Sequence, residues 1–118
     1  MARRSYGDGI ELVRGRINDP KQQGLLLLFV NGRLVQATQT QVALFARLYR
    51  SRGCVVPYRE LSKIMGHVGE NRPSLRQYIR WIKRLLAEHK LPYVITMALE
   101  IGYALCEIQQ DRRAKKGR

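Results

Sequence analysis

The sequence has few acidic residues and few histidines, and these shortages limit the functions that the protein can have. Lys and Arg number 22 against 9 Asp and Glu, which gives a formal net charge of +13 over 118 residues. The two histidines, His67 and His89, stand in different predicted segments, and no recognisable nucleophile–base arrangement accompanies either. We therefore expect no catalytic residues and no enzyme activity.

Cysteine and long apolar runs are also scarce. Cys54 and Cys106 are far apart and form no CxxC or Cys/His ligand pattern, so we expect no metal site and no cofactor. Each lies in an apolar run typical of a buried free thiol in a reducing cytosol. The start, Met-Ala-Arg-Arg, is not followed by the apolar run of a secretory signal. The longest apolar stretch, residues 25 to 30, is too short to span a membrane. We expect a cytoplasmic, nucleoid-associated protein with no membrane partner.

The excess of positive charge is the main clue to a partner. Self-repulsion among so many cations opposes compaction, and a polyanionic partner is a natural reason to tolerate it. Double-stranded DNA is the first candidate, because neutralising phosphates releases counterions. An anionic membrane surface and a merely soluble basic surface are the alternatives. Hydrophobic residues make up 45% of the chain, which is enough for one domain with a core.

Three regions are predicted along the chain. Residues 1 to 24 are polar and basic and suggest a loose arm, with one possible short strand from Ile10 to Val13. Residues 25 to 108 carry the domain, and residues 109 to 118 form a basic, mobile tail. The domain opens with a buried strand over residues 25 to 30, a hairpin signal at Asn31-Gly32 and an alternating strand over residues 33 to 37.

Three helices are predicted next. Thr38 and Gln41 form a capping box, and apolar residues at helical spacing continue the first helix to a stop at residues 51 to 53. After a short apolar link over residues 54 to 56, Pro57 opens a short second helix. The third helix covers about residues 74 to 89. Residues 93 to 108 are rich in β-branched and aromatic residues and predict a final hairpin with its turn near Glu100.

The third helix is predicted to have one apolar and one basic face. At about 100° per residue, a core stripe falls within roughly 40° of Leu75. It comprises Leu75, Ile79, Ile82 and Leu86. The opposite face carries four cations and one amide: Arg76, Gln77, Arg80, Lys83 and Arg84. Arginine pairs bidentately with guanine and glutamine with adenine in the major groove, while a solvated face usually mixes charges of both signs. The sequence thus predicts that this helix enters a DNA groove.

The order of elements, strands, three helices and a hairpin, predicts an α+β fold of the winged helix-turn-helix class. The sequence resembles the OmpR/PhoB-type winged-helix effector domain of bacterial response regulators from about residue 25 to residue 105. Residues 37 to 45 look like the family's Leu-Thr-Pro-Thr-Glu-Phe-x-Leu-Leu, and residues 53 to 61 are similar to Gly-x-Val-Val-Ser-Arg-Glu-x-Leu. Residues 79 to 86 follow the pattern of the family's third helix, and residues 101 to 105 match Val-Gly-Tyr-x-Leu at the end of its wing.

The resemblance implies sequence-specific transcription regulation on direct-repeat sites, with a homodimer as one possibility. Its third helix would read the major groove through the basic face named above, together with Arg72 at the start of that helix. Tyr58, Arg59 and Thr38 would approach phosphates. The loop that begins with Gly66 and ends with Pro73 could contact RNA polymerase.

Two departures from the family affect these expectations. We expect no receiver domain before the fold, so regulation would come from abundance, a partner or a ligand. The family's wing commonly carries Arg-Gly at its tip, whereas Leu99-Glu100 stand here. Whether the wing contacts DNA is left open, and Arg3, Arg4 and the tail from Arg112 to Arg118 are the alternative source of such a contact. Two further functions stay open: a nucleoid-type non-specific DNA binder, and a winged-helix protein-interaction module.

Overall fold

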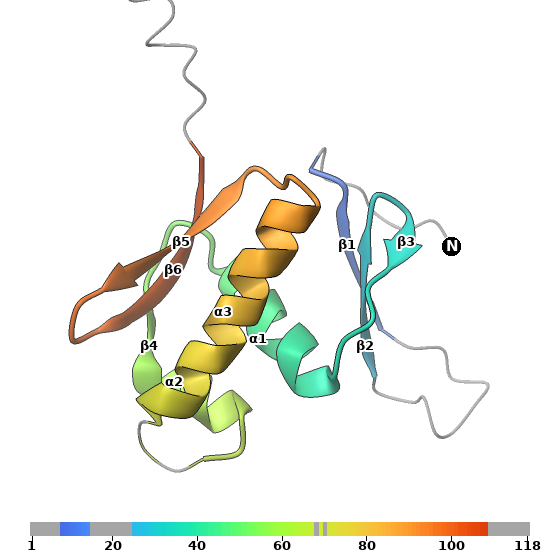
Figure 1. The fold of residues 1–118 in the computed structure, drawn as a ribbon. Helices are drawn as coiled ribbons and strands as arrows, with labels where there is room; N and C mark the ends of the chain where they lie inside the picture. The colour runs from blue at the N-terminus through green and yellow to red at the C-terminus, as the bar shows by residue number, and fades with distance from the viewer. Residues whose placement is uncertain (1–7, 15–24, 68, 70, 109–118) are drawn as a thin grey trace, which may run out of the picture.

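The computed structural model describes residues 8–14, 25–67, 69 and 71–108, and these form an α+β fold. This fold consists of three helices and two small antiparallel sheets, and the strand orders of the sheets are β1-β2-β3 and β4-β6-β5. The elements are β1 (Ile10–Arg14), β2 (Leu26–Val30), β3 (Arg33–Leu34), α1 (Gln39–Arg50), β4 (Val56–Pro57), α2 (Tyr58–Ile64), α3 (Arg72–Glu88), β5 (Tyr93–Ala98) and β6 (Gly102–Glu107). Helix α1 lies between the sheets and contacts both β2 and β6, while α2 and α3 pack against α1 and the second sheet (Figure 1).

The first sheet extends the folded unit toward the N-terminus. β1 pairs antiparallel with β2, and Ile10 opposite Val30 is fully buried. The predicted short strand is therefore confirmed, but the domain begins earlier than residue 25. Asn31 and Gly32 both have positive φ, at 52° and 83°, as a two-residue hairpin of type I′ requires. The strand after this turn ends at Leu34, sooner than predicted.

Asp8 fastens the start of β1 to two other elements. Its Oδ2 accepts hydrogen bonds from the hydroxyls of Tyr49 in α1, at 2.9 Å, and Tyr93 in β5, at 2.5 Å. Its Oδ1 accepts from the backbone N–H of Ile10 at 3.0 Å. Burial acts to raise the pKa of Asp8, but these donors stabilise the carboxylate and lower the pKa below 3.8.

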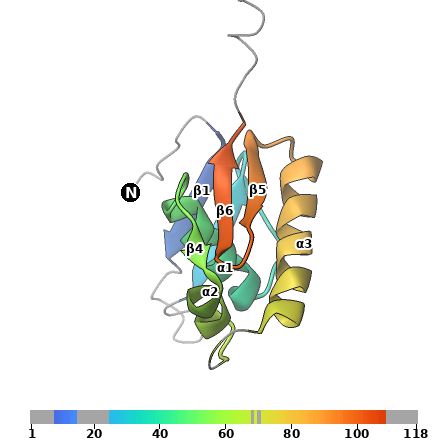
Figure 2. The ribbon, with the colours of Figure 1, turned by 90° about the vertical axis from the view of Figure 1, so that its left-hand side faces the viewer.

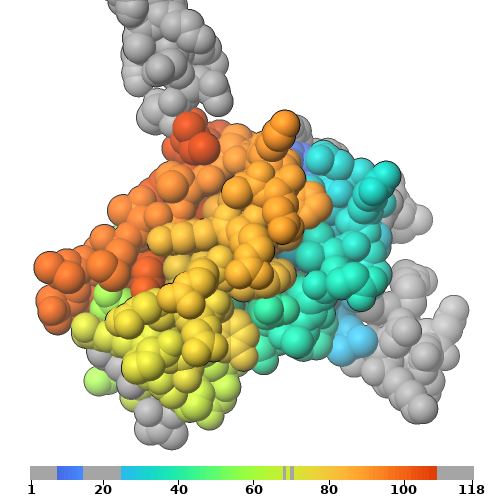
Figure 3. Space-filling view, viewed as in Figure 1, coloured from blue at the N-terminus to red at the C-terminus, as the bar shows by residue number. Residues whose placement is uncertain are grey.

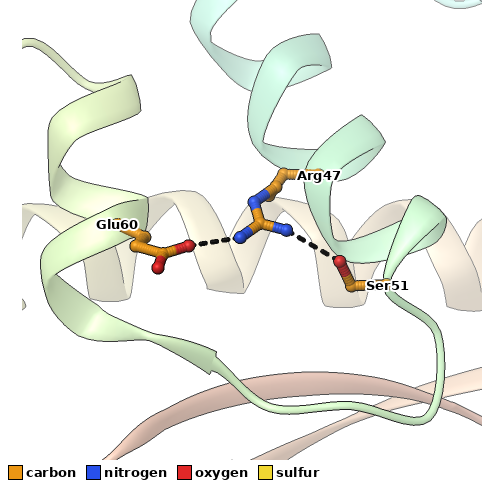
Figure 4. Close-up of polar contacts among 3 residues, drawn as sticks. All are labelled: Arg47, Ser51 and Glu60. Carbon is orange, nitrogen blue, oxygen red and sulfur yellow. Dashed lines mark hydrogen bonds and ion pairs between the residues drawn. The ribbon is translucent and has the colours of Figure 1, made fainter.

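The first helix begins and ends as predicted. The Thr38 side chain accepts from the backbone N–H of Gln41, and the Gln41 side chain accepts from that of Thr38. Arg47 then ties the helix to its surroundings, since it donates to Ser51 Oγ at 2.8 Å and forms an ion pair with Glu60 of α2 (Figure 4). This pair joins α1 and α2 at the surface, beside the apolar packing between the two helices.

The link between α1 and α2 is partly a strand. β4 pairs with β6, with Val56 opposite Tyr103, so this segment completes the second sheet. The run was too short to show its pairing in the sequence. Cys54, just before it, is exposed, so the expectation of a buried thiol there is wrong, and Cys106 is half-buried. Both cysteines are free.

The second sheet ends in a hairpin formed by β5 and β6. Its turn lies at residues 99–101, between the paired Ala98 and Gly102, slightly earlier than predicted. Figure 2 shows this hairpin beside β4, with α3 along one edge of the molecule. Gly102 lies where β4 crosses closely, because a Cβ on it would meet the carbonyl oxygen of Val56 at 2.0 Å. Only glycine fits there without moving a strand.

Gly102→Ala is expected to destabilise the protein by about 1–3 kcal/mol, the range for overpacking a tight site. The added methyl would push β4 away from β6, because its nearest neighbours are backbone atoms that cannot rotate away. Urea unfolding followed by circular dichroism measures the effect. Thr96→Ala on the exposed side of β5 is the control, with an expected change within about 0.5 kcal/mol. Equal stability of the two variants would contradict the close crossing.

Asp8→Asn is expected to lower the free energy of unfolding by about 1–2 kcal/mol at pH 7, less than a fully buried charged acceptor because Asp8 is partly exposed. Since the folded-state pKa of Asp8 is lowered, the stabilisation is complete above its unfolded pKa and is lost as the pH falls through the folded value. Urea titrations at pH 7 and below pH 3.8 should show the difference from wild type shrinking at acid pH. Glu88→Gln, at an exposed carboxylate, serves as control.

Candidate nucleic-acid interface

The outer face of α3 carries the predicted basic residues, and all of them are exposed. Asn71 caps the helix, since its side chain accepts from the backbone N–H of Ser74 at 3.2 Å, so α3 starts two residues before the predicted position. The predicted core stripe is buried in contact with α1 and β5, and Leu85 joins it. The outward residues are Arg76, Gln77, Arg80, Lys83 and Arg84. Figure 3 shows the side chains of α3, yellow to orange, across the front of the molecule.

Four arginines on α3 are spaced by four residues and form one row, consisting of Arg72, Arg76, Arg80 and Arg84. Residues four apart are neighbours on a helix, and like charges at that spacing destabilise it by a few tenths of a kcal/mol per pair. In the described part of the chain, no ion pair offsets Arg76, Arg80 or Arg84. The last three arginines of the row thus form a line of positive charge along α3 that no ion pair among the described residues neutralises.

Arg72 differs from the rest of the row because it joins α3 to its neighbours. Its guanidinium lies 4.2 Å from the centre of the Tyr58 ring in α2, a cation–π arrangement. Its Nη2 also lies 3.6 Å from a carboxylate oxygen of Glu100 at the turn of the hairpin. Arg72 is half-buried there, so it holds the start of α3 against the hairpin in addition to carrying charge.

Tyr58 does not lie on the surface, and its expected phosphate contact is wrong. Its side chain is only 3% exposed, and its ring packs edge-on against Tyr103 at 5.6 Å. Its backbone N–H is also occupied, because it donates to the carbonyl of Ile101 at 3.0 Å. Arg59, the next residue, is exposed on α2. A tyrosine that opens a helix gives no sign in sequence of which way its ring turns.

Thr38 and Gln77 meet at one hollow between the start of α1 and the first turns of α3. The hollow is lined by polar groups from three segments, and Met65 and Tyr78 form its apolar part. Its polar residues are Thr38, Gln41, His67, Ser74 and Gln77. The structure therefore brings a predicted phosphate-contacting residue beside a predicted base-reading residue.

Two cations that the sequence did not single out lie beside the basic face. Arg33 in β3 lines a groove with Trp81 and Arg84 of α3. Lys90, just after α3, lines another with Lys83. Arg33 reaches this groove because the β2–β3 hairpin lies beside α3. The sequence pattern of α3 alone could not predict this neighbour.

The loop between α2 and α3 is fastened at both ends by Ser62. The buried Ser62 hydroxyl accepts from the backbone N–H of Asn71 at 2.9 Å, and its carbonyl accepts from the N–H of His67 at 3.0 Å. Residues 68 and 70 of the loop lie outside the described residues. The α2–loop–α3 arrangement is thus fixed by hydrogen bonds as well as by the core.

The side chains on this face are cationic or hydrogen-bonding groups. Among the described residues there is no group of three or more side chains suited to hold a metal ion. None of the helices in those residues is both long and apolar enough to cross a bilayer. The face presents cations, an amide and a capped helix start, which suit anionic and hydrogen-bonding partners. No protein-family model matches the sequence, and no curated protein matches it.

Proposed function

We propose that the protein binds double-stranded DNA in a sequence-specific manner, as a transcription regulator of the winged-helix type with α3 in the major groove. The observation that carries this proposal is the outer face of α3, where Arg76, Gln77, Arg80, Lys83 and Arg84 are exposed. Among the described residues, no acidic side chain forms an ion pair with Arg76, Arg80 or Arg84. The buried stripe behind this face holds the backbone of α3 in place, so the face is formed before a ligand arrives.

The dimensions of α3 suit this role. With 17 residues it is about 25 Å long, and a helix about 10–12 Å across matches the width of a major groove of about 12 Å. Arg80 lies mid-helix, where an outward side chain would reach base edges. Gln77, beside the hollow at Thr38, offers the paired donor and acceptor that match adenine.

Residues around α3 suit phosphate contacts on either side of the groove. The exposed Arg59 and the Thr38 hydroxyl lie on α2 and at the start of α1, while Arg33 and Lys90 flank the other half of α3. Such contacts set the register of a protein on the duplex without reading bases. The loop of residues 66–73 is a surface for RNA polymerase in this proposal, and binding as a homodimer on direct repeats is its extension.

Arg80→Ala is expected to cost about 1–3 kcal/mol on a preferred site and less on random DNA, because it removes a base contact. The preferred site comes first from selection of sequences from a random duplex pool, and affinities are then measured by fluorescence anisotropy. Arg50→Ala is the matched control: it removes the same charge from an exposed position at the end of α1, in a groove with Arg14 and Leu26.

Equal losses for Arg80→Ala on both kinds of duplex would reject base reading at this position. A selection that yields no preferred sequence, together with a steep salt dependence, would identify a non-specific nucleoid-type binder instead. Absence of binding to any duplex at low salt would reject DNA binding altogether and favour a protein-interaction module.

Arg59→Ala is expected to reduce the slope of log K against log salt by about 0.9, the change for one lost phosphate contact. Tyr58→Phe is expected to leave that slope unchanged, since the Tyr58 ring and backbone are buried against Tyr103 and Ile101. Anisotropy titrations at several salt concentrations compare the two variants. A lower slope for Tyr58→Phe would show that its hydroxyl reaches phosphate after all.

A further inference from the structure

The tip of the β5–β6 hairpin exposes large apolar side chains. Met97 is 52% exposed, Leu99 71% and Ile101 56%. We call these three residues, with Glu100, the hairpin tip. Exposed apolar residues scattered singly are ordinary on a protein surface, but here three of them stand within five consecutive residues at the end of the β5–β6 hairpin.

The hairpin tip is held firmly in place. Its three-residue loop is closed by a hydrogen bond from the N–H of Ile101 to the carbonyl of Ala98 at 2.9 Å. The Ile101 carbonyl accepts from the backbone N–H of Tyr58, which ties the tip to α2. Glu100 has a φ of 67°, the left-handed region that glycine favours. The chain tolerates this backbone strain at the point where it projects Leu99 outward.

The tip has no positive charge with which to attract a phosphate backbone. Residues 91 to 108, which contain the whole hairpin, include no Lys or Arg. The only acid at the tip, Glu100, lies 3.6 Å from Arg72, which offsets its repulsion toward phosphate. A tip of this composition has little to offer a phosphate backbone, but it suits the apolar interior of a base stack.

We propose that the hairpin tip acts as a wedge: Leu99, supported by Met97 and Ile101, inserts between two base pairs from the minor groove and kinks the duplex. The inference rests on the proposed binding of DNA by α3. Apolar wedges of this kind unstack a step and bend DNA by about 20–90°. The wedge makes the protein a DNA-bending factor as well as a reader of sequence.

The tip lies beside the helix proposed to bind DNA. Arg72 joins the start of α3 to Glu100, so a duplex lying along α3 passes close to the tip. A minor groove is only about 6 Å wide, too narrow for the end of a β-hairpin whose two strands alone are about 4.8 Å apart before side chains are added. Unstacking a step opens the groove, and flexible pyrimidine–purine steps do this most readily.

The experiment measures bending and unstacking separately from binding. A duplex containing the selected site carries donor and acceptor dyes at its ends for energy transfer, and 2-aminopurine at successive steps beside the α3 footprint. The full chain is compared with Leu99→Ala and with the double variant Leu99→Ser/Ile101→Ser. Val55→Ser is the matched control, because Val55 is a 41% exposed apolar residue just before β4. Thermal melting verifies that each variant is folded.

The wild-type protein and Val55→Ser should bend the duplex and raise 2-aminopurine fluorescence at one step. The double variant should reduce the bend by at least half and abolish the fluorescence rise, with affinity changed less than about tenfold. Leu99→Ala should fall between.

Wild-type binding that leaves the duplex straight and stacked would overturn the wedge while leaving DNA binding by α3 intact. Equal bending by the double variant would overturn it too. No binding to any duplex would overturn both proposals, and Leu99-dependent binding to vesicles of anionic phospholipid in that case would assign the tip to a membrane surface.

Discussion

The packing of one stripe of α3 determines most of what this protein presents to solvent. Leu75, Ile79, Ile82 and Leu86 are each at most 5% exposed and face α1 and β5. Each such side chain contributes about 1.5–3 kcal/mol when it is buried, whereas a repulsive arginine pair costs only a few tenths. The apolar stripe therefore sets the rotation of the helix, and the arginine row must face outward whatever repulsion follows. The basic face is a consequence of the core.

The sequence predicted the elements better than it predicted their contacts. The capping box at Thr38, the hairpin at Asn31-Gly32 and the two faces of α3 depend on residues a few positions apart, so local chemistry decides them. β4 could not be predicted, because a two-residue strand exists only through its pairing with β6. The predicted N-terminal arm included β1 for the same reason. Ile10 lies in the core because β1 pairs with β2 and Asp8 bonds to Tyr93, and both partners are distant in sequence.

The residues of the candidate site show the same difference between local and long-range effects. Which residues of α3 face outward follows from the helical repeat, so these were predictable one by one. Tyr58 was assigned by analogy of position, and its ring turns inward because Tyr103 and Arg72 form its surroundings. Arg33 joins the basic face from a different sheet. Long-range packing, which no local pattern encodes, decides both cases.

Arg72 is the residue at which the two proposed activities meet. It belongs to the arginine row by position, yet its guanidinium stacks on Tyr58 and faces Glu100. A mobile hairpin would lose backbone conformational entropy each time it bound DNA. A hairpin that contacts α2 and α3 has already lost that entropy on folding. The backbone of the tip is hydrogen-bonded to α2, which packs against α3. In the proposed complex, DNA on the basic face would therefore meet Leu99 at a fixed place. A duplex that resists kinking at that place could not contact both the tip and α3. The deformability of the flanking DNA would therefore add to the sequence specificity that α3 provides by reading bases.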